Sequence, residues 1–315
     1  MPIPEVLPSV AGRELRTKLK EARENAGRTR NDVARALDWS VTKLLRIENG
    51  DVRITTTDLR ALTREYQIGD EEIDRLVELA RISRRPTLGS EYRDVMTKEF
   101  NRWLEFEMNA KYIRQYESKL LPGILQDDEY AKSVVTAYSN GVTKAAIARI
   151  VEARLKRAAY LLRRDGPSMW FVIDEAALRR GVGNSPTDVS FSVMLQTLRN
   201  LKRLNTVGRA RRGEKIEDEL NPNVSIQVMP LAYGIYPALR GPFEVLDFAN
   251  PGHDYMLYEE NPREDFVLQD SATEIDEYLK KFKWLEATTP EPELTNDLID
   301  EIIDLMEKGR NGVSG

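Results

Sequence analysis

The sequence of 315 residues contains no cysteine and a single histidine, His253. The lack of cysteine excludes disulfide bonds, a cysteine nucleophile and thiolate metal sites. A single histidine leaves little room for a histidine-based triad or a multi-histidine metal site. His253 lies in the stretch NPGHDY, which is typical of a turn, so we expect an exposed side chain. No metal site is predicted.

Long apolar runs and common catalytic motifs are missing too. No run approaches the ~20 residues that cross a bilayer, and the N-terminal MPIPEVLPSV lacks the basic start and apolar core of a signal peptide. Phosphate loops, dinucleotide fingerprints and HExxH motifs are absent. The pairs Asp174–Glu175 and Glu259–Glu260 end apolar stretches, but neighbours on a strand point to opposite faces. We therefore expect Asp174 to cap a helix, and predict a soluble, cytoplasmic protein with no cofactor and no enzymatic activity.

Charge is segregated along the chain, although the formal net charge is only −5. Residues 13–64 carry 13 Lys and Arg against 8 Asp and Glu, a net of +5. Residues 144–215 carry 16 against 6, a net of +10, and residues 244–315 carry 6 against 19, a net of −13. The basic first segment suits a polyanion. The acidic last segment suits neutral or basic partners, or the chain's own basic middle.

The stretch Ser40–Gly50, SVTKLLRIENG, has the pattern of a short, capped helix. Serine is a favoured N-cap and glycine a favoured stop. Leu44 and Ile47 share one face, and Lys43 and Arg46 point elsewhere. Because cationic side chains near the N-terminal end of such a helix fit the major groove of DNA, the pattern indicates a recognition helix.

Helical spacing predicts four further helices around this one, over residues 13–26, 30–37, 57–66 and 70–82. Thr29 and Thr57 are the predicted N-caps of the second and fourth. Residues 1–12 hold three prolines and are predicted to form a loose arm. The sequence thus predicts a mainly α-helical domain over residues 13–84, followed by a linker over residues 85–90.

The string RENAGRTRNDVARALDWSVTKLLRIENG resembles the five-helix, repressor-type helix-turn-helix of the XRE family. The resemblance covers about residues 13–69 and implies a transcription regulator whose partner is a double-stranded DNA operator. It also pairs an arginine late in the first helix, Arg23, with the glutamate near the end of the recognition helix, Glu48. We expect this ion pair to be buried and to fix the helix packing rather than to contact DNA.

The same resemblance implies a surface that contacts DNA. Arg or Lys to guanine is the commonest specific base contact. Leu45 stands where the family often has a small polar residue, and is expected to touch a thymine methyl group. The implied contact residues are Arg30, Ser40, Val41, Thr42, Lys43, Arg46 and Arg53, of which Ser40 and Arg53 would lie near phosphates.

A larger α+β domain is predicted over residues 91–290, because the composition changes after Arg84–Arg85–Pro86. Its first part, Ser90–Glu117, carries apolar and aromatic residues every three or four positions, which predicts one long amphipathic helix. The aromatic stripe on it, which includes Trp103 and Tyr116, is expected to be core. Part of the stripe is also a candidate dimer seam or partner surface.

Short apolar runs between Gly, Pro and Asn predict a small mixed or antiparallel sheet in this domain. The predicted strands are residues 170–173, 224–229, 243–248, 255–258 and 266–268, with helices over 175–180 and 189–204. Residues 208–219, GRARRGEKIEDE, are predicted to be an exposed or disordered loop. Residues 291–315 are predicted to form an acidic helix and tail that packs on its own domain or docks a partner.

Segments of this domain resemble, in order, the C-terminal domain of WhiJ-like actinomycete regulators, a domain of unknown function. They include LLPGILQDDEYAKSV, FVIDEAALRRGVG, NVSIQVMPL and GPFEVLDF, and span about residues 98–290. The resemblance implies a bacterial homodimer encoded beside a small BldB-like partner protein, in a pairing similar to toxin–antitoxin systems.

Two other functions stay open. A small-molecule-responsive repressor would hold an apolar ligand in a pocket lined by Trp170, Tyr233, Tyr236 and Tyr255, although these are equally good core residues. An enzyme with a vestigial DNA-binding head would need a convergent polar site, which the sequence does not show.

Overall fold

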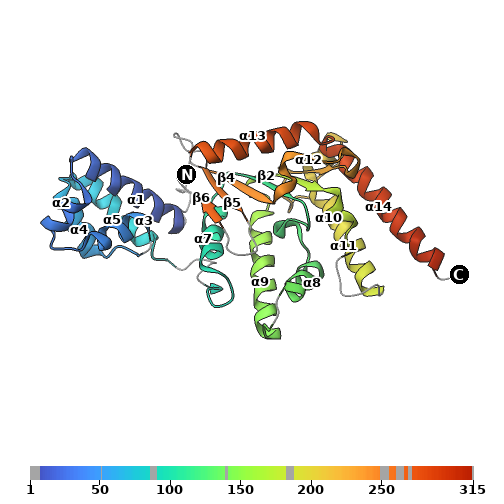
Figure 1. Cartoon of the computed structure of the whole chain (residues 1–315), viewed down its shortest axis with the longest axis horizontal. Coiled ribbons are helices and arrows are strands. Elements are labelled where there is room, and N and C mark those ends of the chain that lie inside the picture. The colour runs from blue at the N-terminus through green and yellow to red at the C-terminus, as the bar shows by residue number, and fades with distance from the viewer. Residues whose placement is uncertain are drawn as a thin grey trace. The chain divides into compact units, whose positions relative to one another are not determined.

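The structure, a computed structural model, describes residues 8–50, 52–85, 91–138, 141–181, 188–248, 255–259, 266–268 and 272–313. The chain divides into two compact units, Met1–Glu91 and Tyr92–Gly315. Figure 1 colours both units along the sequence, with the first unit in blue. His253, expected in an exposed turn, lies outside the described residues.

Local capping sets the ends of the helices in the first unit. Thr29 forms a capping box with Asp32, and Ser40 Oγ accepts a hydrogen bond from the backbone N–H of Lys43 at 3.1 Å. Gly50 ends the third helix in the left-handed conformation, with φ of 78°. The described helices are α1 (Pro8–Asn25), α2 (Arg30–Ala36), α3 (Val41–Asn49), α4 (Thr56–Glu65) and α5 (Asp70–Ile82).

The structure differs from the sequence prediction at two helix starts in this unit. α1 begins at Pro8, within the residues predicted as a loose arm, because proline suits the first turn of a helix and Ala11 is fully buried. α4 begins one residue before Thr57. Its cap is Thr55, whose Oγ1 accepts a hydrogen bond from the backbone N–H of Asp58 at 3.0 Å.

The second unit is built on a six-stranded mixed sheet with the order β3-β2-β1-β4-β5-β6. β1, β2 and β3 are parallel neighbours, and β4, β5 and β6 continue the sheet as antiparallel pairs on the other side of β1. The strands are β1 (Tyr112–Glu117), β2 (Ser168–Asp174), β3 (Val224–Met229), β4 (Phe243–Asp247), β5 (Tyr255–Glu259) and β6 (Phe266–Leu268). The prediction of an α+β domain with a mixed sheet is confirmed.

The predicted long helix over Ser90–Glu117 is wrong. α7 (Lys98–Glu107) ends at Met108, and Tyr112–Glu117 forms β1 in the middle of the sheet. The apolar residues of this stretch fit a helical period and a strand alternation equally well. The choice depends on β2 and β4, which hydrogen-bond to β1 on its two sides and lie far away in the sequence.

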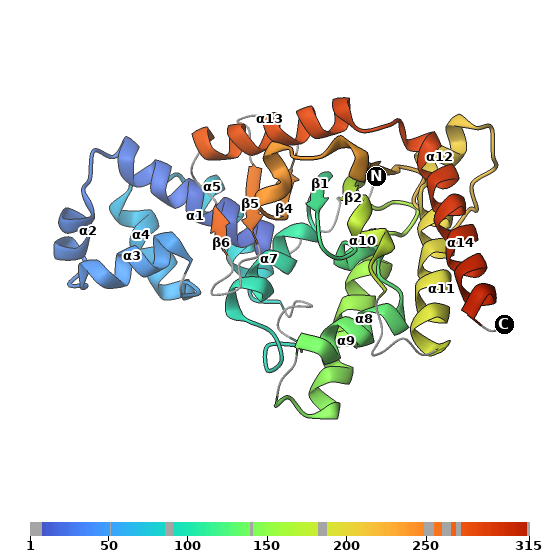
Figure 2. The same ribbon diagram turned by 45° about the vertical axis from the view of Figure 1, so that its right-hand side comes forward.

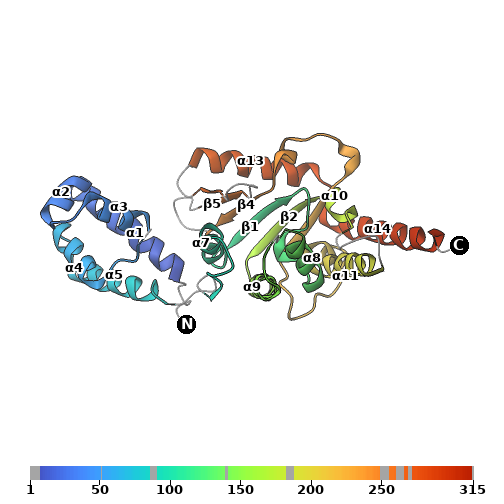
Figure 3. The same cartoon turned by 60° about the horizontal axis from the view of Figure 1, so that its bottom comes forward.

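Helices cover both faces of this sheet. α13 (Ala272–Thr288) lies on one face, and α7, α8 and α9 lie on the other (Figure 3). Side chains alternate accordingly, since Phe171 and Ile173 of β2 pack in the core on the α9 side and Val172 in the core under α13. The other helices of this unit are α8 (Asp128–Tyr138), α9 (Lys144–Leu161), α10 (Glu175–Arg179), α11 (Asp188–Leu204), α12 (Thr206–Arg211) and α14 (Pro292–Val313). Three short 3-10 turns are η1 (Gly123–Leu125), η2 (Leu231–Tyr233) and η3 (Pro237–Arg240).

The predicted loop over residues 208–219 begins as a helix instead. Its first residues belong to α12, whose start is anchored by tertiary contacts. Thr206 Oγ1 donates to the carbonyl oxygen of Asn221 at 2.8 Å. Gly208 packs so closely on the backbone of Pro292 that a Cβ would lie 2.5 Å from its carbonyl oxygen. These contacts come from distant segments and outweigh the high local charge.

The acidic C-terminal helix pairs with the basic middle of the chain. Figure 2 shows α14 lying alongside α11 and α12. Their charged side chains form a ladder of ion pairs: Arg211 with Glu291 and Glu293, Arg212 with Asp297, Lys202 with Asp300, and Arg199 with Glu307. Beneath the ladder, Ile299 and Ile302 are buried in the main core. Of the two predicted roles for this helix, packing on its own domain is the one observed.

A charged cluster is buried between α7, α9 and β4. The guanidinium of Arg157 forms a two-pronged ion pair with Glu107, its Nε donating to Oε2 at 2.5 Å. A second carboxylate, Glu244, lies 3.7 Å from the same guanidinium. Burial and the facing charge of Glu107 raise the pKa of Glu244 well above its usual range, although Arg157 opposes them.

This cluster makes stability depend on pH. Because the pKa of Glu244 is higher in the folded chain, its contribution is fully present below its unfolded pKa and is lost as pH rises through the folded pKa. Glu244→Gln imitates the protonated form. Urea unfolding between about pH 5 and 8 should therefore show the variant gaining stability over the wild type as pH rises. The exposed Glu286→Gln is the control, and parallel pH profiles for wild type and Glu244→Gln would contradict the assignment.

Candidate nucleic-acid interface

Helix α3 presents a continuous exposed stripe. Leu44 and Ile47 bury one side of the helix in the core of the first unit, so its other side faces outward. At 3.6 residues per turn, positions i, i+1, i+4, i+5 and i+8 share one face. The exposed residues with this spacing are Val41, Thr42, Leu45, Arg46 and Asn49. Arg46 is the cation of the stripe, and no residue that the structure describes pairs with its side chain.

Glu48 is the node that fixes α3 against its neighbours. Its carboxylate is only 4% exposed and accepts a hydrogen bond from Arg23 Nε of α1 at 2.7 Å and from Arg30 Nε of α2 at 2.7 Å. Burial alone would lower the pKa of Arg23, but the hydrogen bond and charge of Glu48 outweigh it and the pKa is raised. Arg23 also donates to the carbonyl oxygen of Arg28 at 2.9 Å, which ties the α1–α2 turn to the same node.

Lys43 is held at the edge of the stripe by its own fold. Its Nζ lies 2.7 Å from Asp58 Oδ1 of α4 and 3.8 Å from the ring centre of Trp39. The side chain is 39% exposed, so solvent still reaches it. Lys43 and Arg30 thus flank the stripe as partly neutralised cations, whereas Arg46 has no ion-pair partner in the described part of the chain.

The other two residues implied to contact DNA have different settings. Ser40 is exposed, but its hydroxyl oxygen caps α3. Arg53 is exposed in the loop before α4, and its guanidinium donates to the carbonyl oxygen of Arg84 at 3.4 Å. Asn49, the last residue of α3, is not among the contact residues that the resemblance implies. The steps of four from Val41 through Leu45 to Asn49 were the signal that places it on the stripe.

The aromatic residues predicted as ligand or partner contacts do not line one pocket. Trp103 is fully buried and stacks on Tyr258, with ring centres 4.9 Å apart. On the opposite face, Tyr236 donates to Asp174, and its hydroxyl lies 2.8 Å from that of Tyr116. Burial raises the pKa of Tyr116 to about 12. Trp170, Tyr233, Tyr236 and Tyr255 all pack on the α13 side of the sheet.

Asp174 caps α10, as predicted, since its Oδ1 accepts a hydrogen bond from the backbone N–H of Ala176 at 2.8 Å. Its other oxygen accepts from Tyr236. Both carboxylate oxygens therefore accept hydrogen bonds from the fold.

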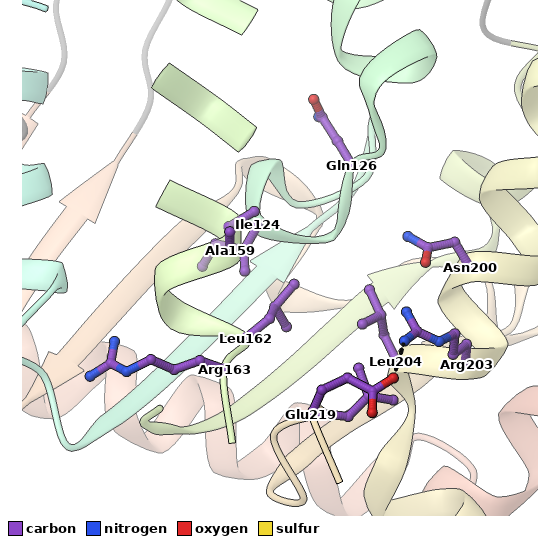
Figure 4. Close-up of a pocket in the computed structure, with 11 residues that line it drawn as sticks. Ile124, Gln126, Ala159, Leu162, Arg163, Asn200, Arg203, Leu204 and Glu219 are labelled. Atoms are coloured by element: carbon purple, nitrogen blue, oxygen red, sulfur yellow. Dashed lines mark hydrogen bonds and ion pairs between the residues drawn. The ribbon is translucent and has the colours of Figure 1, made fainter. Parts of the chain in front are cut away.

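A pocket lies elsewhere in the second unit, between α9 and α11 (Figure 4). It measures about 310 Å³, and its walls include the apolar side chains of Leu162, Leu204 and Leu220. The ion pair between Arg203 and Glu219, 3.3 Å apart, borders it. None of the six aromatic residues proposed from the sequence lines this pocket.

Comparison with known families assigns both units. A family model described as a helix-turn-helix domain matches residues 14–76. A second model, described as a domain of unknown function (DUF5753), matches residues 100–210 and 216–301, more than half of the chain. The chain belongs to the DUF5753 family. No curated protein and no solved structure matches it significantly.

The match in the first unit confirms the XRE-like resemblance and supports a DNA-binding regulator. Within the described part of this DUF5753 chain, no three His, Asp or Glu side chains are grouped to hold a metal ion. In the same residues, no helix is both long and apolar enough to cross a membrane.

Removal of the Glu48 carboxylate should destabilise the first unit. We expect Glu48→Ala to lower its free energy of unfolding by ~3–5 kcal/mol, because Arg23 would stay buried without its partner. Hydrogen exchange of the α2 and α3 amides in the full chain measures this. Glu24→Ala is the matched control, since Glu24 also contacts Arg23 but is 54% exposed. The control should change stability by less than ~0.5 kcal/mol, and equal effects would rule out Glu48 as the node.

Proposed function

We propose that this DUF5753-family chain is a sequence-specific DNA-binding transcription regulator that acts in the cytoplasm. The observation that carries the proposal is the exposed stripe of α3, which is backed by a buried apolar side and fixed by Glu48. A rigid helix with its outer face free is what a major groove accepts. The matching helix-turn-helix family model supports the same function.

Each side chain of the stripe suits a particular contact. The unpaired guanidinium of Arg46 would donate two hydrogen bonds to a guanine edge, and Val41 and Leu45 would pack on thymine methyl groups. Thr42 offers a hydroxyl to a base or a phosphate. Asn49, at the far end of the same stripe, would donate to the backbone of the duplex or to an adenine.

The flanking cations would position the helix on the phosphates. Arg30 uses its Nε for Glu48, which leaves the terminal N–H groups of a 40% exposed side chain for a phosphate. Lys43 would exchange Asp58 for a phosphate oxygen. Ser40 and Arg53 lie at the two ends of the α3 region and would add contacts to the backbone. Such contacts set the register and orientation but carry no sequence information.

The second unit would dimerise and receive a signal. A homodimer of this kind reads two half-sites ~34–36 Å apart. The resemblance to WhiJ-like regulators favours a small protein encoded nearby as the signal. The alternative is a small-molecule-responsive repressor, and the pocket between α9 and α11 is the observation that favours it.

A salt titration tests the main proposal. The full chain is titrated against DNA from upstream of its own gene and against a scrambled duplex of the same length. Preference for the upstream DNA, with log affinity falling linearly against log salt, would support an operator reader, and the slope would count its phosphate contacts. Equal, weak binding of both duplexes would reject it.

Arg46→Ala should weaken specific binding by ~1–3 kcal/mol and relax the preference at one base-pair position, because one bidentate base contact is lost. Measurement requires a set of duplexes with each operator position substituted in turn. Arg81→Ala on α5 is the charge-matched control, since Arg81 pairs with Glu78 of its own helix. Unchanged affinity and preference for Arg46→Ala would remove Arg46 from the base-reading set.

Asp58→Asn should strengthen binding to all duplexes by ~2–5-fold, because it frees Lys43 for a phosphate and steepens the salt slope. Asp74→Asn on α5 makes the same change of charge at an exposed position on a different helix. The gain should exceed that of this control and should disappear in the Lys43→Gln background. A gain that survives Lys43→Gln would mean that Asp58 acts only through net charge.

A further inference from the structure

An acidic segment, residues 214–219 with sequence EKIEDE, forms ion pairs with several arginines of the second unit. Asp218 pairs with Arg164 at 3.2 Å, and Glu219 with Arg203 at 3.3 Å. Earlier in the segment, Glu214 and Glu217 both form ion pairs with Arg209. Of these three arginines, Arg203 lines the pocket, as does its partner Glu219.

The pair between Arg203 and Glu219 stands directly at the pocket. Figure 4 shows Asn200 and Arg203 together on α11, and opposite them Ala159 on α9 with Leu162 and Arg163 just beyond its end. The side chains of Arg203 and Glu219 are 45% and 69% exposed. Exposed ion pairs of this kind contribute little to stability, so Arg203 can exchange one carboxylate for another at small cost.

Other polar groups at the pocket are already committed or lack the charge of Arg203. The amide of Gln126 donates to the carbonyl oxygen of Leu121 and accepts from Arg154. Arg163 stacks on Tyr160 and pairs with Asp165. The Asn200 amide has no hydrogen-bond partner among the described residues, and it lies one helical turn from Arg203. These two side chains form the available polar anchor.

We propose that this pocket binds a small monocarboxylate with an apolar body. Its carboxylate would replace Glu219 on the guanidinium of Arg203 and accept a further hydrogen bond from the Asn200 amide. Its apolar body would fill the space between Leu162, Leu204 and Leu220. A hollow of about 310 Å³ is at the small end of ligand pockets, which suits one ring system or a short chain.

The segment 214–219 then acts as an internal competitor, because Glu219 occupies the position that the ligand carboxylate needs. This inference gives a ligand class to the small-molecule alternative. It does not rest on DNA binding, and its test uses no DNA, so its failure leaves the main proposal untouched.

The test is calorimetric titration of the full chain with three carboxylates of different shape: octanoate, 1-naphthoate and indole-3-acetate. The matching primary amides are titrated beside them. At least one acid should bind with one site per chain, and its amide should bind at least ~10-fold more weakly, because the charged hydrogen bonds to Arg203 are lost.

Three variants locate the site. Arg203→Gln should weaken binding of that acid at least ~10-fold. Glu219→Gln should strengthen it by ~2–5-fold, because Glu219 is the nearer of the two carboxylates on Arg203, the other being Glu217 at 4.0 Å. Arg211→Gln, which removes an equal charge paired with Glu291 and Glu293, should leave the affinity unchanged. The gain in Glu219→Gln cannot come from misfolding.

Any of three results overturns the proposal. They are no binding by any of the three acids, equal binding by an acid and its amide, or binding that is unchanged in Arg203→Gln. Equal binding by the amide would point to an apolar pocket that does not select charge.

Discussion

The carboxylate of Glu48 is the point on which the geometry of the first unit depends. It is almost fully buried, and it takes Arg23 from one helix and Arg30 from another. A buried carboxylate is costly unless its partners are well placed, so the three helices keep a single arrangement that satisfies it. That arrangement keeps one side of α3 exposed. On this side, the Arg46 side chain pairs with no residue that the structure describes.

The second unit also contains a buried ion-pair cluster, and this one positions helices on a sheet. Arg157 is buried against Glu107 and Glu244, and this cluster joins α7 and α9 to the middle of the sheet. Burial, followed by the facing charge of Glu107, raises the pKa of Glu244, and the single guanidinium of Arg157 only partly opposes this. The cluster specifies how the helices sit on the sheet more than it adds stability.

The basic middle of the sequence and its acidic segments form ion pairs with each other in the fold. In the described part of the chain, seven cations of residues 144–215 pair with carboxylates of the segment 214–219 or of residues 291–307. These pairs are largely exposed, so each adds little stability, but together they occupy cations that would otherwise attract polyanions. Among the residues that the structure describes, neither Arg46 of the α3 stripe nor the Asn200 amide beside Arg203 takes part in such a pair.

The sequence by itself determined what depends on neighbouring residues. Caps at Thr29, Ser40 and Gly50, the stripe of α3, the cap at Asp174 and the strands 224–229 and 266–268 all follow from local propensity and side-chain period. Tertiary structure decided the rest. Tyr112–Glu117 became a central strand because β2 and β4 offered it hydrogen bonds on both sides. The sequence likewise did not reveal the ion-pair partners of Arg30, Lys43 and Arg203. A local pattern shows that a charge is present but not which distant carboxylate will pair with it.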